Sequence, residues 1–133
     1  MKYLLDTNIC IYLIKKRPLS VLTMLHKKKL SDVVISSVTV AELEHGVAKS
    51  ERPGQNRLAL MEFLTPYDVI PFDAADAVAF GEINTVLERA GKTIGPMDML
   101  IAAQAVSREL ILVSNNLREF SRVAGLKTEN WAD

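Results

Sequence analysis

The fold is decided first near the N-terminus, where residues 2–14 read KYLLDTNICIYLI. Residues 2–5 are apolar enough for a short buried strand, and this strand ends at Asp6. A mostly buried helix is expected next, because Thr7 or Asn8 can cap its first turn and apolar residues dominate the positions after them. The stretch therefore predicts a strand that presents one carboxylate at its carboxyl end.

Further short apolar runs alternate with helical patterns along the rest of the chain. Extended segments are expected at residues 32–37, 67–71, 109–114 and 127–130. Helices are expected at residues 20–28, 38–48, 55–64 and 72–90, from residue 96 onward, and at 117–123. Continuous apolar strands between helices are typical of a parallel sheet that is buried on both faces. We therefore predict an α/β fold, a three-layer α/β/α sandwich with a mostly parallel sheet of four to five strands, and a single domain over residues 1–133.

The composition is that of a globular protein, with 133 residues, 49% hydrophobic and 24% charged. No stretch approaches the length of a membrane span, and residues 6–8 interrupt the first apolar run too early for a signal peptide. Cys10 is the only cysteine, so an intramolecular disulfide is excluded. We expect a cytoplasmic protein with no membrane contact.

The charges balance overall but are unevenly distributed. There are 16 basic and 16 acidic residues, a poor composition for a dedicated nucleic-acid binder. Residues 1–50 contain eight Lys/Arg and four Asp/Glu, and residues 51–100 reverse these counts. The basic excess is concentrated at residues 15–17 and 27–29. Such clusters can contact phosphates, although charge runs are usually solvated faces, so both interpretations stay open.

Oxygen-bearing side chains come after several of the expected strands. Asp6 lies directly after the first strand, and Glu42 lies one to two turns into the helix after the second. Asp98 lies in the first turn of the helix that leads to the fourth strand, and Ser114 and Asn116 come after that strand. Ligands of open parallel sheets bind beyond the carboxyl ends of the strands, near the point where the strand order reverses. We therefore expect these side chains to meet at one edge of the sheet.

The three carboxylates together predict a metal site. Taken singly, Asp98 can simply favour the positive end of its helix, and Glu42 can face solvent. Asp6 is harder to explain in this way, because a carboxylate between apolar neighbours is costly to bury without a metal ion or a donor cluster. Carboxylates without histidine suit Mg²⁺ or Mn²⁺, which prefer oxygen ligands. Such an ion can polarise a phosphoryl oxygen and activate a bound water, which is the chemistry of many nucleases.

Four sequence motifs resemble those of PIN-domain proteins. They read LLDTNI (residues 4–9), ISSVTVAELEHG (35–46), IGPMDMLIAA (94–103) and LVSNNLREF (112–120). Their order and spacing, together with the terminal GLKTENW (125–131), closely resemble the VapC-type toxins of bacterial type II toxin–antitoxin systems. The resemblance spans essentially the whole chain.

The resemblance implies an endoribonuclease that cuts specific structured RNAs and stops translation, commonly by cutting tRNA, with the anticodon loop of initiator tRNA as a first guess. Asp6, Glu42 and Asp98 match the family's metal-binding and catalytic carboxylates. Water activated at Mg²⁺, with Mn²⁺ also accepted, would leave 3′-hydroxyl and 5′-phosphate ends. A homodimer is implied, as is a VapB-type antitoxin that wraps the toxin, reaches the acidic site and builds a larger assembly.

One position departs from the family pattern. Many members have an aspartate where this chain has Asn116, after the hydroxyl residue Ser114. An amide can orient a metal-bound water but supplies no charge, which leaves open whether one or two ions bind. Glu119, one helical turn further on, is a candidate for the missing carboxylate. Thr7 and Asn8 can hydrogen-bond a metal-bound water or cap their helix.

An alternative function is a non-catalytic PIN-like module that binds RNA or protein without cutting. The balanced charge and Asn116 favour it, whereas the complete set of three carboxylates argues against it. Phosphotransfer at Asp6 is disfavoured, because a haloacid-dehalogenase-type phosphatase needs a second aspartate where Asn8 stands.

Overall fold

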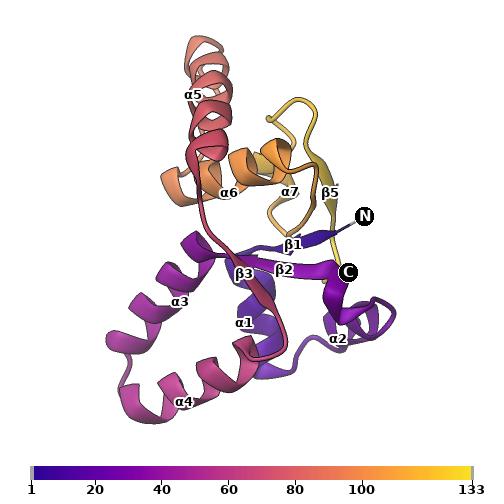
Figure 1. The fold of residues 1–133 in the computed structure, drawn as a ribbon, viewed down its shortest axis with the longest axis vertical. Coiled ribbons are helices and arrows are strands. Elements are labelled where there is room, and N and C mark those ends of the chain that lie inside the picture. The colour runs from indigo at the N-terminus through magenta and orange to yellow at the C-terminus, as the bar shows by residue number, and fades with distance from the viewer. Residues whose placement is uncertain (1, 133) are drawn as a thin grey trace.

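The sheet has five parallel strands in the computed structural model, which describes residues 2–132. Their order across the sheet is β3-β2-β1-β4-β5, so the first strand of the chain lies in the middle (Figure 1). The strands are β1 (Tyr3–Leu5), β2 (Val33–Ser36), β3 (Asp68–Ile70), β4 (Ile111–Val113) and β5 (Lys127–Glu129). Every neighbouring pair is parallel, so the predicted parallel sheet is confirmed.

Helices cover both faces of this sheet and complete the predicted three layers. They are α1 (Thr7–Lys15), α2 (Leu19–His26), the 3-10 helix η1 (Leu30–Asp32), α3 (Ser37–Ala48), α4 (Pro53–Leu64), α5 (Ala74–Arg89), α6 (Pro96–Ser107) and α7 (Leu117–Phe120). Helices α1 to α4 pack on one face of the sheet and α5 to α7 on the other. Connections between parallel strands are right-handed, so helices lie on one face while the chain moves from β1 to β3 and on the opposite face once it moves back toward β5. The hairpin of α3 and α4 and the helix α5 project from the body in different directions (Figure 1). Across residues 2–132, no helix has the length and apolar character needed to cross a membrane.

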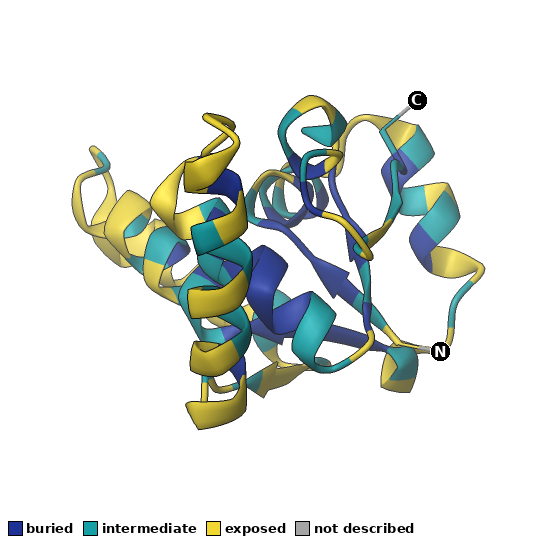
Figure 2. Ribbon diagram, turned by 90° about the horizontal axis from the view of Figure 1, so that it is seen from above, coloured by how far each residue is buried: buried dark blue, intermediate teal, exposed yellow. Residues whose placement is uncertain are grey.

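The core consists of two apolar layers, one on each side of the sheet. Successive strand residues point to opposite faces, so Leu4 packs with α5 to α7 and Leu5 packs with α1 to α4. In the same way Val34 joins the first layer and Ile35 the second. Figure 2 shows these strands as buried at the centre, with the exposed residues on the outer sides of the helices. Burial on both faces explains why the strands are continuously apolar in sequence.

The order of the strands reverses at β1, between β2 on one side and β4 on the other. The register pairs Leu5 with both Ile35 and Val113, so the carboxyl ends of the three strands are level. Asp6 extends this ladder, since its backbone N–H donates to the carbonyl of Val113 at 3.0 Å. Asp6 and Ser114 therefore leave the sheet side by side, at the place where open parallel sheets bind ligands.

Helix α1 has a different cap from the one expected. The prediction of Thr7 or Asn8 was wrong, because Asp6 is the capping residue and its Oδ1 accepts the N–H of Ile9 at 2.9 Å. A carboxylate suits this position, since it satisfies an otherwise unpaired N–H and lies at the positive end of the helix. Asp6 therefore has a structural role beside its predicted chemical role.

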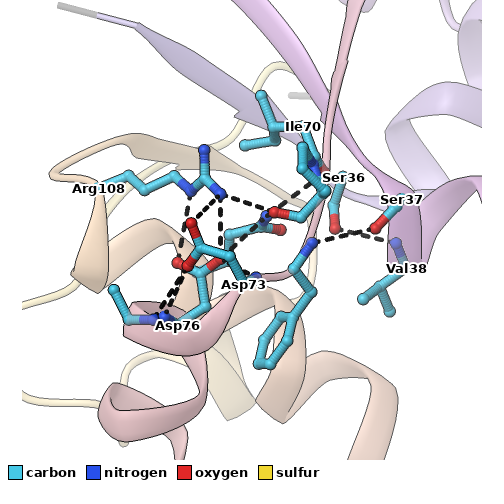
Figure 3. A network of polar contacts seen from close by, with 11 residues as sticks. Ser36, Ser37, Val38, Ile70, Asp73, Asp76 and Arg108 are labelled. Carbon is cyan, nitrogen blue, oxygen red and sulfur yellow. Dashed lines mark hydrogen bonds and ion pairs between the residues drawn. The ribbon is translucent and has the colours of Figure 1, made fainter.

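A polar network around Arg108 holds α5 and α6 together (Figure 3). The guanidinium lies 3.2 Å from Asp76 and 3.3 Å from Asp73, and it donates to the carbonyl of Pro71 at 2.6 Å. Asp73 caps α5, and Asp76 completes a capping box by accepting the N–H of Asp73. The network joins the end of β3 to both helices. It thus helps to fix α6, whose first turn carries Asp98.

Candidate metal centre

Asp6 is the innermost carboxylate of the candidate site. Its residue is only 4% exposed, because Leu5 and Ile9 on either side belong to the core. Besides the N–H of Ile9, the hydroxyl of Ser114 contacts the carboxylate through a hydrogen bond. The contact to Ser114 arises from the parallel pairing of β1 with β4, which places the residues after the two strands next to each other. Ser114 therefore orients Asp6, a contact made across 108 residues of sequence.

Glu42 reaches the site from the second turn of α3. Its carboxylate accepts a hydrogen bond from the hydroxyl of Thr7 at 2.6 Å. Helix α3 begins directly after β2, where Ser36 caps it by accepting the N–H of Val38. The predicted supporting residue Thr7 thus contacts a carboxylate. Asn8 lies beside it in the sequence but is exposed on α1, and in residues 2–132 its side chain makes no hydrogen bond to the acidic group.

Asp98 and Glu119 are joined by Asn116. The amide Nδ2 of Asn116 donates to Asp98 at 3.3 Å and to Glu119 at 3.0 Å. Asp98 is the third residue of α6, whereas Asn116 and Glu119 belong to the turn and short helix after β4. The structure therefore brings Glu119 close to Asp98, and the neutral amide of Asn116 holds the two carboxylates together.

The carboxylates repel one another. Burial raises the pKa of Asp6 to about 6, against the lowering effect of hydrogen bonds from Ser114 and Ile9, and the charges of Asp98 and Glu42 raise it further. Burial also raises the pKa of Asp98, with additional contributions from the charges of Glu119 and Glu42. No ion pair found within residues 2–132 involves these four side chains. The site therefore holds concentrated negative charge that a cation would relieve.

The residues present fit a hydrated magnesium ion better than a metal held by protein ligands alone. Within the described chain, no group of three or more His, Cys, Asp or Glu side chains is arranged to hold an ion by itself. Mg²⁺ keeps several waters and is usually bound through one or two carboxylates, so it does not need a complete protein cage. Oxygen donors without nitrogen or sulfur ligands suit the same hard cation.

The raised pKa of Asp6 predicts a pH-dependent stability. The carboxyl group binds its proton more tightly in the folded state than in the unfolded state, so its contribution is present at low pH and is lost as the pH rises from about 4 to about 6. A pKa raised from 3.8 to about 6 corresponds to about 3 kcal/mol. We therefore expect Asp6→Asn, which cannot ionise, to be more stable than the wild type at pH 7.5 in EDTA but not at pH 4.

Urea unfolding of both proteins at several pH values measures this difference. Added Mg²⁺ should reduce the difference in stability between the two proteins at pH 7.5, because it should stabilise only the wild type. If the free energies of unfolding of the wild type and Asp6→Asn changed with pH in the same way, burial would not raise the pKa of Asp6 and the prediction would be wrong.

The chain belongs to the PIN-domain family, since a sequence profile of the PIN domain matches residues 3–126. It is 48% identical over 131 residues to Ribonuclease VapC2 of Haemophilus influenzae, covering 98% of each chain. It is 46% identical over 132 residues to the tRNA(fMet)-specific endonuclease VapC of Shigella flexneri, covering 99% of each. Within the PIN domains, the chain is therefore a member of the VapC group.

The fold agrees with this placement. The structure of DNA-bound VapBC from Salmonella typhimurium contains a chain that superposes with a TM-score of 0.93, at 39% identity and with 98% of each chain covered. The resemblance found in the four motifs is thus confirmed over the whole chain.

Proposed function

We propose that this protein is the toxin of a VapBC-type pair, a Mg²⁺-dependent endoribonuclease that cuts structured RNA in the cytoplasm and so stops translation. The observation that carries the proposal is the buried Asp6 at the reversal point of the sheet, close to the charges of Asp98 and Glu42 and without a cationic partner among residues 2–132. Burying such a carboxylate is costly unless a ligand compensates for it.

Asp6, Asp98 and Glu42 would hold the ion together with its bound waters and not as a complete protein cage, with Glu119 beside Asp98. When bound, Mg²⁺, or Mn²⁺ in its place, would polarise a phosphoryl oxygen and lower the pKa of a bound water. The protein's own groups prepare this site before substrate arrives. Ser114 and the Ile9 N–H fix the orientation of Asp6, and Thr7 holds Glu42. Asn116 holds Asp98 and Glu119 on one amide, so both carboxylates would be positioned before an ion binds.

The proposed substrate is tRNA, with initiator tRNA as the first candidate. The support is the name of the Shigella flexneri relative, a tRNA(fMet)-specific endonuclease, at 46% identity over nearly the whole chain. A second relative with the same name, from Salmonella typhimurium, is 39% identical over 98% of the chain. Hydrolysis by an activated water would leave a 3′-hydroxyl and a 5′-phosphate.

The proposed protein partner is a VapB-type antitoxin, because the superposed neighbour is part of a VapBC complex. An apolar groove of about 340 Å³ between α1, α3 and α4 offers a place for an apolar antitoxin segment, and its lining includes Thr7 and Glu42. A segment lying there would reach the carboxylates and block RNA. A homodimer is also proposed, since Val78 and Val86 lie exposed two helical turns apart on the projecting helix α5.

A pulse of expression and subsequent sequencing of RNA 5′ ends tests the function directly. We expect new 5′ ends at one or a few positions in tRNA with the wild type and none with Asp6→Asn. Both proteins must accumulate to the same level, and coexpression of the cognate VapB-type antitoxin should suppress the cuts. If the wild type and Asp6→Asn produced the same RNA 5′ ends, the nuclease assignment would be wrong and a binding module would be favoured.

A further inference from the structure

Tyr12 is attached to the carboxylate edge of the sheet by a contact that the sequence does not predict. Its phenolic oxygen accepts a hydrogen bond from the side-chain amide of Asn115 at 2.7 Å, across 103 residues of sequence. Asn115 lies between Ser114, which contacts Asp6, and Asn116, which contacts Asp98. The ring of Tyr12 is therefore held beside the turn that builds half of the candidate metal centre.

A hollow of about 380 Å³ opens next to this ring. It is lined by Ile11, Tyr12, Lys15, Arg17 and Pro18. The left-handed backbone of Lys16 ends α1, and the N–H of Arg17 then donates back to the carbonyl of Tyr12 at 3.1 Å. This turn brings the side chain of Arg17 to the same hollow as Lys15, although α1 has already ended. An aromatic ring and two cations thus face one space.

The two cations are available to bind an anion. Lys15 and Arg17 are exposed, and within residues 2–132 neither forms an ion pair. Lys15 also lines the groove that contains Thr7 and Glu42, so its side chain borders both the hollow and the groove that holds one of the site's carboxylates. Tyr12 is six residues beyond Asp6, about 9 Å along the helix axis, a distance that two or three nucleotides of a strand can span.

Only one of the two basic clusters seen in the sequence has this position. Lys28, in the cluster at residues 27–29, lies over the ring of Tyr3, with its Nζ 4.7 Å from the ring centroid. Tyr3 begins β1, so that cluster lies at the amino end of the sheet, opposite the carboxylates. The fold therefore separates two charge runs that look equivalent in the sequence.

We propose that Tyr12, Lys15 and Arg17 form an RNA-binding subsite that holds one nucleotide of the substrate, with its base on the ring of Tyr12 and its phosphate on the two cations. The inference rests on the proposed ribonuclease function. Four carboxylates at the cleavage site repel an RNA backbone, so cations nearby are needed to hold the strand. Aromatic faces beside cations are the usual features of single-stranded nucleic-acid sites. Asn115 acts as a positioning residue, because it fixes the ring without lining the hollow.

Equilibrium binding of fluorescein-labelled initiator tRNA in EDTA, where cleavage is prevented, tests the subsite. We expect Tyr12→Ala to raise the Kd about 10-fold, as the loss of one stacked base does. The double variant Lys15→Gln/Arg17→Gln should reduce the slope of log K against log salt by about 1 to 2. The matched control Lys27→Gln/Lys29→Gln changes the net charge equally and should bind like the wild type.

Two further measurements separate binding from folding. Tyr12→Phe keeps the ring but loses the contact to Asn115, so it should bind better than Tyr12→Ala at equal thermal stability. In cleavage assays with Mg²⁺, the subsite variants should raise KM while kcat stays near the wild-type value.

The outcomes distinguish this inference from the proposed function. If both Tyr12→Ala and Lys15→Gln/Arg17→Gln bind tRNA with the wild-type affinity, the proposed subsite is wrong, whether or not the protein cleaves RNA. Binding that depends on these residues without any cleavage leaves the subsite standing and overturns the nuclease assignment. If the variants weaken only the antitoxin complex and not tRNA binding, the hollow is a protein-binding site and the inference is wrong.

Discussion

Asp6→Asn is expected to lower the rate of RNA cleavage by on the order of 10³-fold or more while the fold stays intact. A carboxylate that positions a catalytic metal ion supports several kcal/mol of transition-state stabilisation, and each 1.36 kcal/mol corresponds to about tenfold in rate. The amide of asparagine still accepts the N–H of Ile9, so the cap of α1 is preserved. The loss should therefore appear in kcat and not in folding.

Single-turnover cleavage of purified initiator tRNA with Mg²⁺ measures this effect. The matched control is Asp68→Asn, which removes the same charge from an exposed position on β3 and should cleave like the wild type. Removal of the metal by EDTA should abolish cleavage by the wild type, and added Mg²⁺ or Mn²⁺ should restore it. An Asp6→Asn protein as active as Asp68→Asn, or wild-type cleavage that persists in EDTA, would contradict the proposed role of Asp6.

Asp76→Ala is expected to be the most destabilising single change outside the apolar core. Asp76 is completely buried and binds the guanidinium of Arg108, the N–H of Asp73 and the amide of Gln104. Removing the Asp76 carboxylate leaves its buried hydrogen-bond donors without an acceptor, which we expect to lower the free energy of unfolding by about 2–4 kcal/mol. The loss is limited because Arg108 keeps its contacts to Asp73 and Pro71. Figure 3 shows Asp73, Asp76 and Arg108 pointing toward one another.

Urea unfolding at neutral pH should show this loss as a lower midpoint with an unchanged slope. Asp73→Ala is the matched control, since it removes an exposed partner of the same arginine together with a helix cap, and it should cost about 1 kcal/mol. Burial opposes the ionisation of Asp76, but hydrogen bonds from Arg108 and the Asp73 N–H outweigh it and hold the pKa below 3.8. The stability from this pair should therefore be present at neutral pH and be lost as the pH falls below about 4. Equal effects of Asp76→Ala and Asp73→Ala would contradict the importance of burial.

Several features of this protein could be predicted from its sequence because they depend on local patterns. Short apolar runs between helical patterns indicated a parallel sheet, since a strand that is buried on both faces has no polar side. The carboxylates could be located by the same reasoning, because Asp6 comes after a strand and parallel strands end at one edge. The family resemblance then added the activity, which the periodicity of the chain does not contain.

Other features were decided only by the tertiary structure. The sequence alone does not predict that Asp6 caps α1, that Asn116 joins Asp98 to Glu119, or that Tyr12 accepts a hydrogen bond from Asn115. Nor does it tell which of two basic clusters lies near the carboxylates. These contacts join residues that are distant in sequence, and their geometry depends on the order of the strands and on the direction in which each helix leaves the sheet. The sequence by itself therefore predicted a metal site and named its three main carboxylates, which stays a prediction. The packing of β1 between β2 and β4 determined their partners, because hydrogen bonds and charge repulsion act over a few ångströms and not along the chain.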